Sequence, residues 1–452
     1  MGEPKTLENS CGSCVIPMLV AGMLVSWTIC WAARFPAVMT PDSMDQWTQL
    51  STGHYNDAHP VAHTLLLRAA DSVWPNPAAG VVVQFVLMAL AAGYALAVVR
   101  DLVPGQAMVI AAGAWFILHP VCGALQTTLW KDVPFSSAFL AFTACMVRIL
   151  QSRNQPLALF DWSVLGLSGL CLCLWRHNGL AVTIAGLACL AAIQPQRHWR
   201  HLACLATILA CLAGFKIVIV RVFHAPPPPL SASLAIPLQQ TAAIIAADGV
   251  VTDAQREGIS AILPWSFWKG AYSRTIVDPL KFHPQFDARV IGSAPGRYLT
   301  IWLGLCWQNP GLAFRAWLRQ TAVLWDPVVD ARDTYPVGIV ENRFNLAPRP
   351  LSRFLASAVD RLFRAMELPG LAWISRPSLI HALLLTAAGI CLAGGGPPAL
   401  APFVPWAAAT FVLFFLIPSP DFRYFYPAFC SFPVLMAWTH ACRRNRPATP
   451  SN

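Results

Sequence analysis

The sequence MTPDSMDQWTQLSTGHYNDAHPVAHT occupies residues 39–64 and follows the first apolar segment of the chain directly. It contains three aspartates and three histidines, with amide side chains between them. A connection that only reverses the chain beside a membrane does not need so many ionisable groups. Their density indicates a site for proton transfer or for binding a polar ligand. The alternative is a solvated loop that is polar without a function.

The composition of the whole chain is that of an integral membrane protein. Of its 452 residues, 56% are hydrophobic and 12% are charged, whereas about 25% are charged in a soluble domain. The net charge of +10 comes mostly from short loops and the C-terminal tail. It therefore indicates membrane topology and lipid contact, and no nucleic-acid partner is expected.

Ten apolar runs approach the length of about 20 residues that a bilayer crossing needs. We expect an all-α integral membrane protein of about ten transmembrane helices, with periplasmic juxtamembrane helices. The predicted spans are Val15–Ala33, Ala78–Val99, Met108–Leu118 with its flanks, Pro134–Val147, Val164–Trp175 with its flanks, Leu180–Ile193, Leu202–Val222, Ser378–Gly394, Ala401–Ile417 and Phe422–Trp438.

Basic residues predict the orientation of these spans. They concentrate in alternate short loops, and the positive-inside rule puts those loops in the cytoplasm. The polar clusters then all fall on the opposite side, which is the periplasm for a bacterial inner membrane. The loops assigned to the cytoplasm contain Lys5, Arg100, Arg148 with Arg153, Arg197 with Arg200, and Arg443, Arg444 and Arg446.

The chain divides into three parts around its long polar section. Residues 1–222 form an N-terminal module of about seven spans, with the candidate catalytic loop at 34–77. Residues 223–376 form a periplasmic section, and 377–452 hold about three spans and a basic cytoplasmic tail.

The periplasmic section is predicted to contain interfacial helices and no clear globular domain. The four-proline run Pro226–Pro229 predicts a stiff spacer. Ser233–Ala247 is predicted to be an amphipathic helix in which Gln239 and Gln240 are adjacent. Phe314–Trp325 is apolar but short and contains arginines, so it is predicted to lie in the membrane interface.

Asp42 and Asp45 are the candidate catalytic residues of the first loop. They are three apart, so in a helix both carboxylates share one face. A carboxylate at a membrane interface is a suitable general base for a hydroxyl, because partial loss of solvent raises its basicity. The structural alternative is an ordinary helix N-cap at Asp42.

Three basic residues on separate external loops are the candidates for binding an anion. Lys131, Arg176 and Arg423 each lie beside the end of an apolar run. Arginines at membrane depth commonly face a cavity or an anionic partner, so their convergence predicts a pocket for a lipid-linked phosphate or pyrophosphate. Asp132 would orient Lys131 or the acceptor, unless the two form an internal ion pair that only fixes the loop.

His59 and His63 are four residues apart, with Asp57 nearby, and together could hold a metal ion. Hydrogen bonding to a phosphate or to the backbone is the preferred interpretation. No metal site and no cofactor are therefore predicted, and a divalent metal is the alternative.

Several short motifs, in this order and on one side of the membrane, resemble the GT-C class of glycosyltransferases. More narrowly, the chain is similar to bacterial membrane glycosyltransferases related to the protein mannosyltransferase and dolichyl-phosphate-mannose families. The motifs are PDSxxQWxQ from Pro41, YNDxHPxxxT from Tyr55, WKDxPF from Trp130, RHNG from Arg176, PLQQ from Pro237 and DxRYxYP from Asp421. They span most of the chain.

The resemblance implies a polyprenyl-phosphate-linked sugar donor, an acidic base in the first external loop, and basic residues at the lipid phosphate. Many relatives carry adjacent Asp and Glu where this chain has Asp42 and Asp45 separated by two residues, so either carboxylate is a candidate base. The donor phosphate and lipid are assigned to Lys131, Arg176, His177, Arg423 and Tyr424, and the rest of the substrate to Gln46, His59, His63, Asp132, Asn178, Gln239 and Gln240.

The expected function is sugar transfer from an undecaprenyl-type phosphate to a hydroxyl of a cell-envelope glycan, lipid or protein acceptor. The acceptor oxygen would attack the anomeric carbon and invert it, while the cations stabilise the departing phosphate. One alternative is a transporter or flippase of a lipid-linked saccharide, which would use the same pocket without a base. Another is a polymerase or ligase with a pyrophosphate-linked donor.

Overall fold

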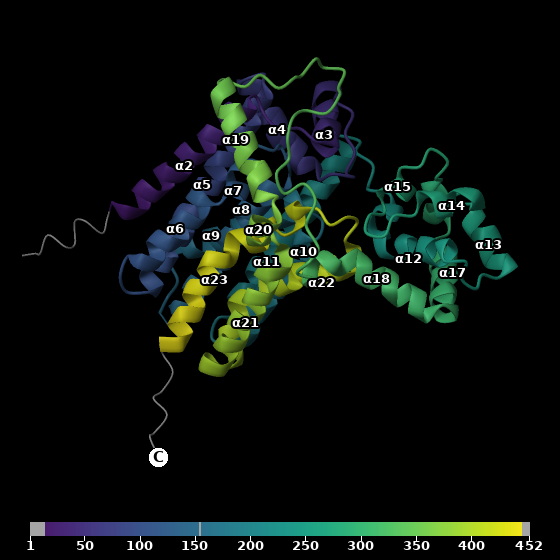
Figure 1. Ribbon diagram of the computed structural model, residues 1–452. Helices are drawn as coiled ribbons and strands as arrows, with labels where there is room; N and C mark the ends of the chain where they lie inside the picture. The colour runs from purple at the N-terminus through teal and green to yellow at the C-terminus, as the bar shows by residue number, and fades with distance from the viewer. Residues whose placement is uncertain (1–13, 153–154, 445–452) are drawn as a thin grey trace, which may run out of the picture.

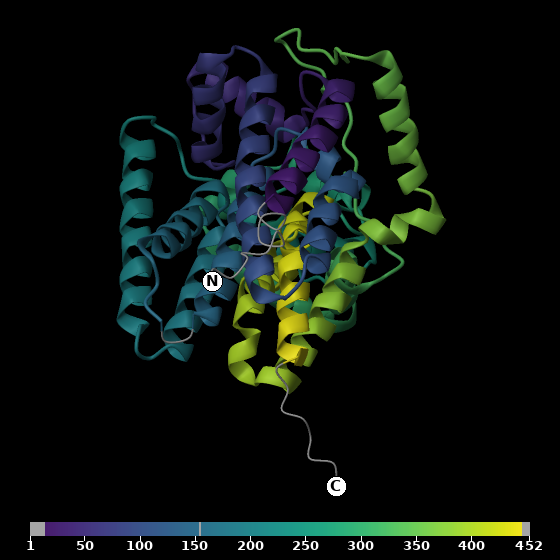
Figure 2. The ribbon, with the colours of Figure 1, turned by 90° about the vertical axis from the view of Figure 1, so that its left-hand side faces the viewer.

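The computed structural model describes residues 14–152 and 155–444 and is helical throughout (Figures 1 and 2). Within this part of the chain, the only β-type pairings are three isolated bridges. A body of long helices forms most of the molecule, and a lobe of short helices projects from one side (Figure 1). Three of the basic residues that predict the orientation lie outside the described residues: Lys5, Arg153 and Arg446.

The body contains helices from both ends of the sequence. It consists of α2 (Val15–Arg34), α3 (Pro41–Thr52), α4 (Val61–Val73), α5 (Pro77–Leu102), α6 (Ala107–Leu118), α7 (Pro120–Gln126), α8 (Asp132–Gln151), α9 (Leu159–Trp175), α10 (Gly179–Ile193), α11 (His198–Arg221), α18 (Pro310–Trp325), α19 (Arg353–Met366), α20 (Pro369–Ala372), η2 (Trp373–Ser375), α21 (Pro377–Gly395), η3 (Pro397–Phe403), α22 (Val404–Leu416), η4 (Phe422–Tyr424) and α23 (Tyr426–Arg444).

Six helices in the described residues are long and apolar enough to cross a membrane, and a seventh span results if the bent pair α6 and α7 is counted as one. The expectation of an all-α membrane protein is confirmed at this level, but the count of ten is not. Two of the predicted spans form α9 and α10, which have only 17 and 15 residues. The last forms α23, which is interrupted by Pro433 and is not among the six.

Helix α8 is the centre of the body. It packs against α5, α9 and α23, and the rings of Phe135, Phe139 and Phe142 are fully buried at helical spacing along it. By contrast, α11 packs mainly against two helices, α9 and α10. It stands at the left edge of the molecule in Figure 2. The N-terminal end of α8 therefore has a fixed position, and this end carries Lys131 and Asp132.

The lobe has its own apolar core, which corrects the expectation that no globular domain occurs here. It consists of η1 (Leu230–Ser233), α12 (Ala235–Ala246), α13 (Asp253–Ser260), α14 (Trp265–Ala271), α15 (Asp278–Lys281), α16 (Ala288–Ser293) and α17 (Pro295–Gln308). Eleven of the twelve residues of α12 are buried, so it is the central helix of the lobe and not an amphipathic surface helix. Trp268 is buried against it with its indole nitrogen donating to the carbonyl of Leu263 at 2.7 Å.

Helix α18 joins the lobe to the body. The indole nitrogen of Trp317 on α18 donates to the carbonyl of Phe414 at 2.8 Å. The side-chain nitrogen of Gln320 donates to the carbonyl of Ile417, also at 2.8 Å. The predicted interfacial helix is therefore packed against α22 along one side, while Phe314 on it stays exposed. After α18 the chain runs back along the body to α19, which docks on α2 through an Arg34–Asp360 ion pair of 2.7 Å.

Candidate functional site

Three short backbone pairings hold the predicted site loops together. Val38 pairs with Thr128, Met39 with Ile339, and Arg332 with Asp421, all in parallel. The chain positions just after these pairings include Asp42, Lys131 and Arg423. The loops that carry the candidate residues are thus joined by backbone hydrogen bonds. No side-chain pattern in the sequence predicts these bonds.

Helix α3 begins at Thr40, and its first turn presents Asp42. The side chain of Ser43 accepts a hydrogen bond from the Thr40 backbone, at 3.2 Å, and donates one to the carbonyl of Leu129, at 2.8 Å. Thr40, and not Asp42, is therefore the N-cap, so the structural alternative for Asp42 is wrong. The helix ends at Gly53, whose φ of 71° is the left-handed conformation that favours glycine at this position.

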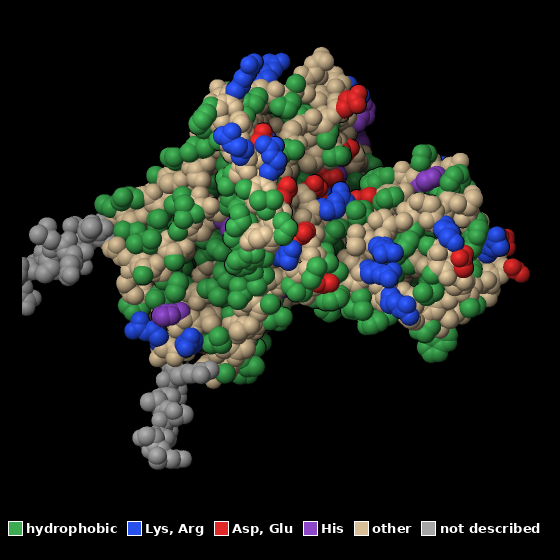
Figure 3. Space-filling view, viewed as in Figure 1, with side chains coloured by type: hydrophobic (Ala, Val, Ile, Leu, Met, Phe, Trp, Pro, Cys, Tyr) green, Lys and Arg blue, Asp and Glu red, His purple; other side chains and the backbone are tan. Residues whose placement is uncertain are grey.

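A cavity of about 340 Å³ lies where the body meets the lobe, and Figure 3 shows acidic and basic side chains gathered in this region. We call it the site cavity. Eight of the predicted residues line it: Asp42, His59, Lys131, Arg176, His177, Asn178, Arg423 and Tyr424. They come from four chain segments, and this convergence is the main feature of the candidate site.

Asp42 is surrounded by cations. One of its oxygens is paired with the Arg423 guanidinium and lies 3.5 Å from the Lys131 ammonium. The other lies 3.8 Å from Nε2 of His59. Arg423 also contacts Asp421 at 3.1 Å, so it links the first turn of α3 to the segment that precedes α23.

The electrostatics of Asp42 differ from the expectation that partial burial makes it more basic. Burial does raise the pKa of the Asp42 carboxyl, but Arg423, Lys131 and His59 together outweigh it and hold that pKa well below its usual range. Asp45 behaves in the opposite way: burial raises its pKa, and the bond from Gln49 only partly offsets this. Asp45 is three residues along α3 and does not line the site cavity.

His59 is a neutral ring that accepts from Lys131. The Lys131 ammonium lies 2.8 Å from Nδ1 of His59, and an ammonium only donates, so the proton of the imidazole is on Nε2, toward Asp42. The positive charge of Lys131, with burial, lowers the pKa of His59 to about 3. Burial in turn lowers the pKa of Lys131.

Arg176 and Tyr424 form the second cationic group. Arg176 is paired with the buried carboxylate of Asp132, so Asp132 orients Arg176 and not Lys131 as expected. The ring of Tyr424 lies between two guanidiniums, 5.0 Å from Arg176 and 5.1 Å from Arg423. An aromatic face attracts a cation, and here one ring holds two in place.

The turn from Arg176 to Gly179 is tight for a steric reason. A Cβ on Gly179 would lie 2.0 Å from the carbonyl oxygen of Leu172, so only glycine allows this closure. In the turn, His177 makes a 3.0 Å hydrogen bond to the carbonyl of Asp57. The side-chain oxygen of Asn178 is buried and has no hydrogen-bond partner among the described residues, so it is available to a ligand.

Gln46 and His63 lie behind the site cavity and do not line it. The side-chain oxygen of Gln46 lies 2.9 Å from Nδ1 of His63, and its nitrogen donates to Thr64 at 3.1 Å. Both side chains are almost fully buried. Their hydrogen bonds join α3 to α4, and their predicted contact with substrate stays a prediction.

Gln239 and Gln240 are also placed away from the site cavity. Gln239 donates to the backbone of Ser273. Gln240 donates to the carbonyl of Ala313, at 3.0 Å, and accepts from Trp302, at 2.9 Å. These bonds are internal to the lobe and its junction with α18, and substrate contact by either amide stays a prediction.

The sequence prediction missed the part of the site that the lobe contributes. Asp278 and Lys281, the ends of the one-turn helix α15, line the site cavity. Within residues 14–152 and 155–444 neither has an ion pair within 4.0 Å. Burial raises the pKa of Asp278, and Lys281 only partly offsets it. Two opposite charges three apart were the only signal in the sequence.

An apolar wall completes the site cavity. Val412, Leu413 and Leu416 of α22 line it, and α22 belongs to a candidate span. The cavity therefore has ionic groups on one side and aliphatic side chains of a membrane helix on the other.

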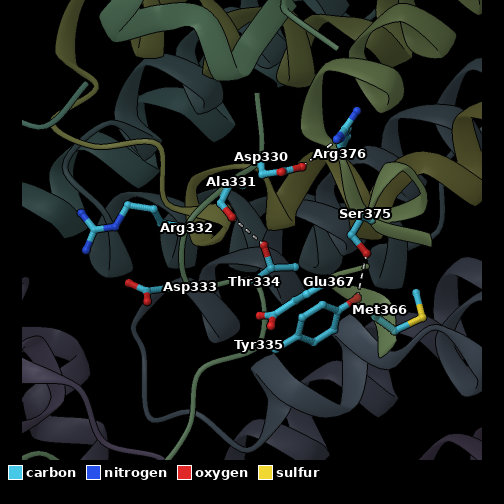
Figure 4. Close-up of a pocket in the computed structure, with 11 residues that line it drawn as sticks. Asp330, Ala331, Arg332, Asp333, Thr334, Tyr335, Met366, Glu367, Ser375 and Arg376 are labelled. Carbon is cyan, nitrogen blue, oxygen red and sulfur yellow. Dashed lines mark hydrogen bonds and ion pairs between the residues drawn. The ribbon is translucent and has the colours of Figure 1, made fainter. Parts of the chain in front are cut away.

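A second cavity, of about 320 Å³, lies behind the Arg332–Asp421 pairing (Figure 4). Figure 4 shows Arg376 turned to Asp330, with which it forms a 2.9 Å ion pair, and Tyr335 bonded to Ser375 at 2.8 Å. None of the predicted site residues lines it. Its wall is formed by a segment paired to Asp421, and Asp421 contacts Arg423 of the site cavity.

No group of three or more His, Cys, Asp or Glu residues within the described ranges is arranged to hold a metal ion. His59 and His63 in particular face different partners, Lys131 and Gln46. The arrangement suits charge-assisted hydrogen bonding to an anion, because guanidinium and ammonium groups converge on one space.

The fold and the site define a helical membrane protein with a mixed ionic and apolar cavity between its membrane-side body and a helical lobe. Residues 47–451 match a family described as a family of unknown function (DUF6020), and the chain belongs to this family. No curated protein matches the chain. No solved structure matches it either.

We predict that the buried His63 makes folding stability depend on pH. Burial, with the charge of Lys131, lowers the pKa of His63 to about 3, whereas an unfolded histidine titrates near pH 6.5. Between these values only the unfolded chain binds the proton. The stability from the neutral ring is therefore complete above about pH 6.5 and is lost as the pH falls toward 3.

His63→Asn keeps a donor near Nδ1 and removes the titration. Between about pH 7 and pH 5 its unfolding free energy should fall less steeply than that of the wild type, by up to about 1.4 kcal/mol per pH unit. Thermal unfolding in detergent, followed by tryptophan fluorescence, measures the difference. His54→Asn, at an exposed histidine, is the control and should keep the wild-type slope. Equal slopes for all three proteins would contradict the buried neutral His63.

Proposed function

We propose that this protein is a polyprenyl-phosphate-sugar-dependent glycosyltransferase. The observation that carries the proposal is the composition of the site cavity: Asp42 with its partners Lys131 and Arg423, and Arg176 paired with Asp132, lie on the ionic side, and α22 offers an aliphatic wall on the other. A phosphate attached to a lipid chain needs both surfaces at once. A soluble anionic substrate would need only the first.

In the proposed complex the donor phosphate binds to Lys131, Arg423 and the free Lys281, while the first isoprene units follow Val412 and Leu416. Arg176 supports the phosphate through Tyr424, because its own guanidinium is already paired with Asp132. The buried, unpartnered amide oxygen of Asn178 and the carboxylate of Asp278 then remain to accept hydrogen bonds from sugar hydroxyls.

Asp42 is the proposed general base, and donor binding is what would activate it. In the ligand-free protein three neighbours hold its pKa well below the usual range, so it binds protons weakly. A phosphate that engages Lys131 and Arg423 adds negative charge beside Asp42 and raises its proton affinity. The base would thus become competent only when the donor is in place.

The proposed reaction inverts the anomeric carbon. The acceptor oxygen forms a bond to that carbon as its proton passes to Asp42. The bond from the carbon to the phosphate oxygen breaks, and its electron pair leaves with the polyprenyl phosphate. Negative charge grows on the departing phosphate, where the cations stabilise it most.

We further propose that the site cavity faces the periplasm of a bacterial inner membrane. The short helices α9 and α10 and the helix α23 would complete ten crossings, with the turn Arg176–Gly179 at the external surface. Acceptors in this compartment are glycans, lipids and proteins of the cell envelope.

The first functional prediction replaces the proposed base. Asp42→Asn keeps the shape of the side chain and cannot take a proton, so transfer should fall by roughly 10² to 10⁴, the range of general-base catalysis. Donor retention should persist or increase, because a negative charge leaves the phosphate site. The rate of transfer is measured with labelled sugar passing from a synthetic polyprenyl phosphate to membrane acceptors. Donor retention is measured by co-purification of the lipid.

Asp45→Asn is the matched control, on the same helix but outside the cavity. A smaller loss for Asp45→Asn supports Asp42 as the base, and a larger loss exchanges their roles. Wild-type transfer by both single variants and by the double variant would remove the general base from this loop. Lipid binding without transfer by the wild type would favour a transporter or flippase.

A second prediction separates phosphate binding from folding. Lys281→Gln breaks no ion pair, so it should weaken retention of polyprenyl phosphate by about 1.5–3 kcal/mol without lowering the melting temperature. Arg176→Gln leaves the buried Asp132 unpaired, so it should lower both the retention of polyprenyl phosphate and the melting temperature. If Lys281→Gln retains the lipid as the wild type does, the phosphate lies elsewhere in the cavity.

A third prediction tests the orientation. A cysteine at exposed Gln285 in the lobe should react with a membrane-impermeant thiol reagent added to intact inner membranes from the periplasmic side. A cysteine at exposed His198, at the opposite end of α11 from the lobe, should react only after the membranes are opened. The reverse pattern would place the site cavity in the cytoplasm and end the proposal of a periplasmic donor.

A further inference from the structure

A second cation-rich cavity, separate from the site cavity, lies on the lobe. It has a volume of about 500 Å³ and is lined by Lys269, Tyr272, Arg274, Arg315 and Arg319 together with small apolar side chains. We call it the basic cavity. No carboxylate lines it, and Figure 3 shows Lys and Arg side chains grouped on this face of the lobe.

The three arginines of the basic cavity are uncommitted. Among the described residues, 14–152 and 155–444, the structure gives Arg274, Arg315 and Arg319 no ion pair and no side-chain hydrogen bond, while Lys269 is paired with Asp248 at 2.9 Å. Arg315 and Arg319 are four apart on α18, so two like charges face each other along the helix. An anion between them would relieve that repulsion and receive donors from several guanidiniums.

A buried hydroxyl independently indicates a ligand. The phenolic oxygen of Tyr272 is buried and has no hydrogen-bond partner within the described part of the chain, and Tyr272 is one of the residues that line the basic cavity. A buried hydroxyl without a partner is unfavourable in a folded protein. A bound acceptor oxygen would satisfy it.

The surroundings of the basic cavity are those of a membrane surface. Phe314, beside Arg315 on α18, is 57% exposed, and Trp307 at the end of α17 is 87% exposed. The other side of α18 packs against α21 and α22, which belong to candidate spans. Arginines next to exposed aromatic side chains at the end of membrane helices suit a lipid headgroup region.

We propose that the basic cavity binds a phosphate group, and that an anionic membrane phospholipid supplies it. The guanidiniums of Arg274, Arg315 and Arg319 donate to the phosphate oxygens together with the Tyr272 hydroxyl, while Phe314 and Trp307 enter the interface beside the acyl chains. The lobe is thereby held against the membrane. This inference does not depend on the proposed transferase activity.

The test uses the full chain purified in detergent and mixed with phosphatidylglycerol or phosphatidylcholine, with retained lipid counted by native mass spectrometry. The variant Arg315→Gln/Arg319→Gln should lose phosphatidylglycerol affinity by about 10-fold or more, since one charge-assisted contact is worth at least that factor. Arg289→Gln/Arg297→Gln removes the same charge from exposed positions on the lobe that do not line the basic cavity. It should keep the wild-type affinity.

A parallel experiment identifies the source of the phosphate. Inorganic pyrophosphate is added to the same proteins, and the melting temperature is measured. Stabilisation of the wild type but not of Arg315→Gln/Arg319→Gln, with equal lipid retention by both, supports a phosphate site and overturns the lipid as its source. Equal losses in the test and control pairs, or no difference among the three proteins in either experiment, would overturn the proposal. Unchanged ligand-free melting temperatures confirm that the variants fold.

Discussion

The ion pair between Arg423 and Asp42 is the interaction on which the candidate site depends. It joins the first turn of α3 to η4, and both partners are largely removed from solvent. Burial of either charge alone would be costly, because an isolated ion in a protein interior loses its hydration. The neighbouring charges compensate for this loss of hydration. Lys131 contacts the carboxylate of Asp42, and Asp421 contacts the guanidinium of Arg423. The site is therefore a network and not a set of independent side chains.

Such a network can change its state when one more charge enters. With no ligand, Asp42 is the anion that the cations share. A phosphate would compete with it for the same donors, and the balance between the two anions would set both donor affinity and the basicity of the carboxylate. A site with fewer cations could bind a phosphate or keep Asp42 ionised, but would link the two less closely.

The sequence predicted much of the site because its residues stand beside apolar runs. Asp42, Lys131, Arg176 and Arg423 could each be located from hydropathy alone, and the orientation rule put them on one side. The sequence also put the amides Gln46, Gln239 and Gln240 with the site, but none of them lines the site cavity. A polar residue in an apolar segment can bond to the backbone or to a neighbouring side chain as readily as to a ligand. Burial decides between these uses, and the sequence does not report burial.

The lobe could not be predicted for a related reason. Its helices are short, and proline and tryptophan interrupt every periodic pattern, so its core forms only from contacts between segments distant in sequence. For the same reason the contribution of Asp278 and Lys281 was missed. The number of spans is a different case. Hydropathy locates apolar runs but not helix ends, and α9 and α10 have 17 and 15 residues, at or below the short end of the range for a crossing. Ten crossings therefore stay a prediction.

The wide sequence separation within the network has a consequence for biosynthesis. Asp42 and Arg423 are 381 positions apart, so at the usual rate of about 5–20 residues per second the arginine is synthesised roughly 20–80 s after the aspartate. During that interval Asp42 lacks its Arg423 partner, while the part of the chain that carries His59 and Lys131 is synthesised. The arrival of η4, which carries Arg423, completes the charge balance. A nascent chain therefore lacks the complete site until its final helix is in place. A chain truncated before Arg423 has an incompletely paired Asp42 carboxylate, a defect that quality-control proteases can recognise.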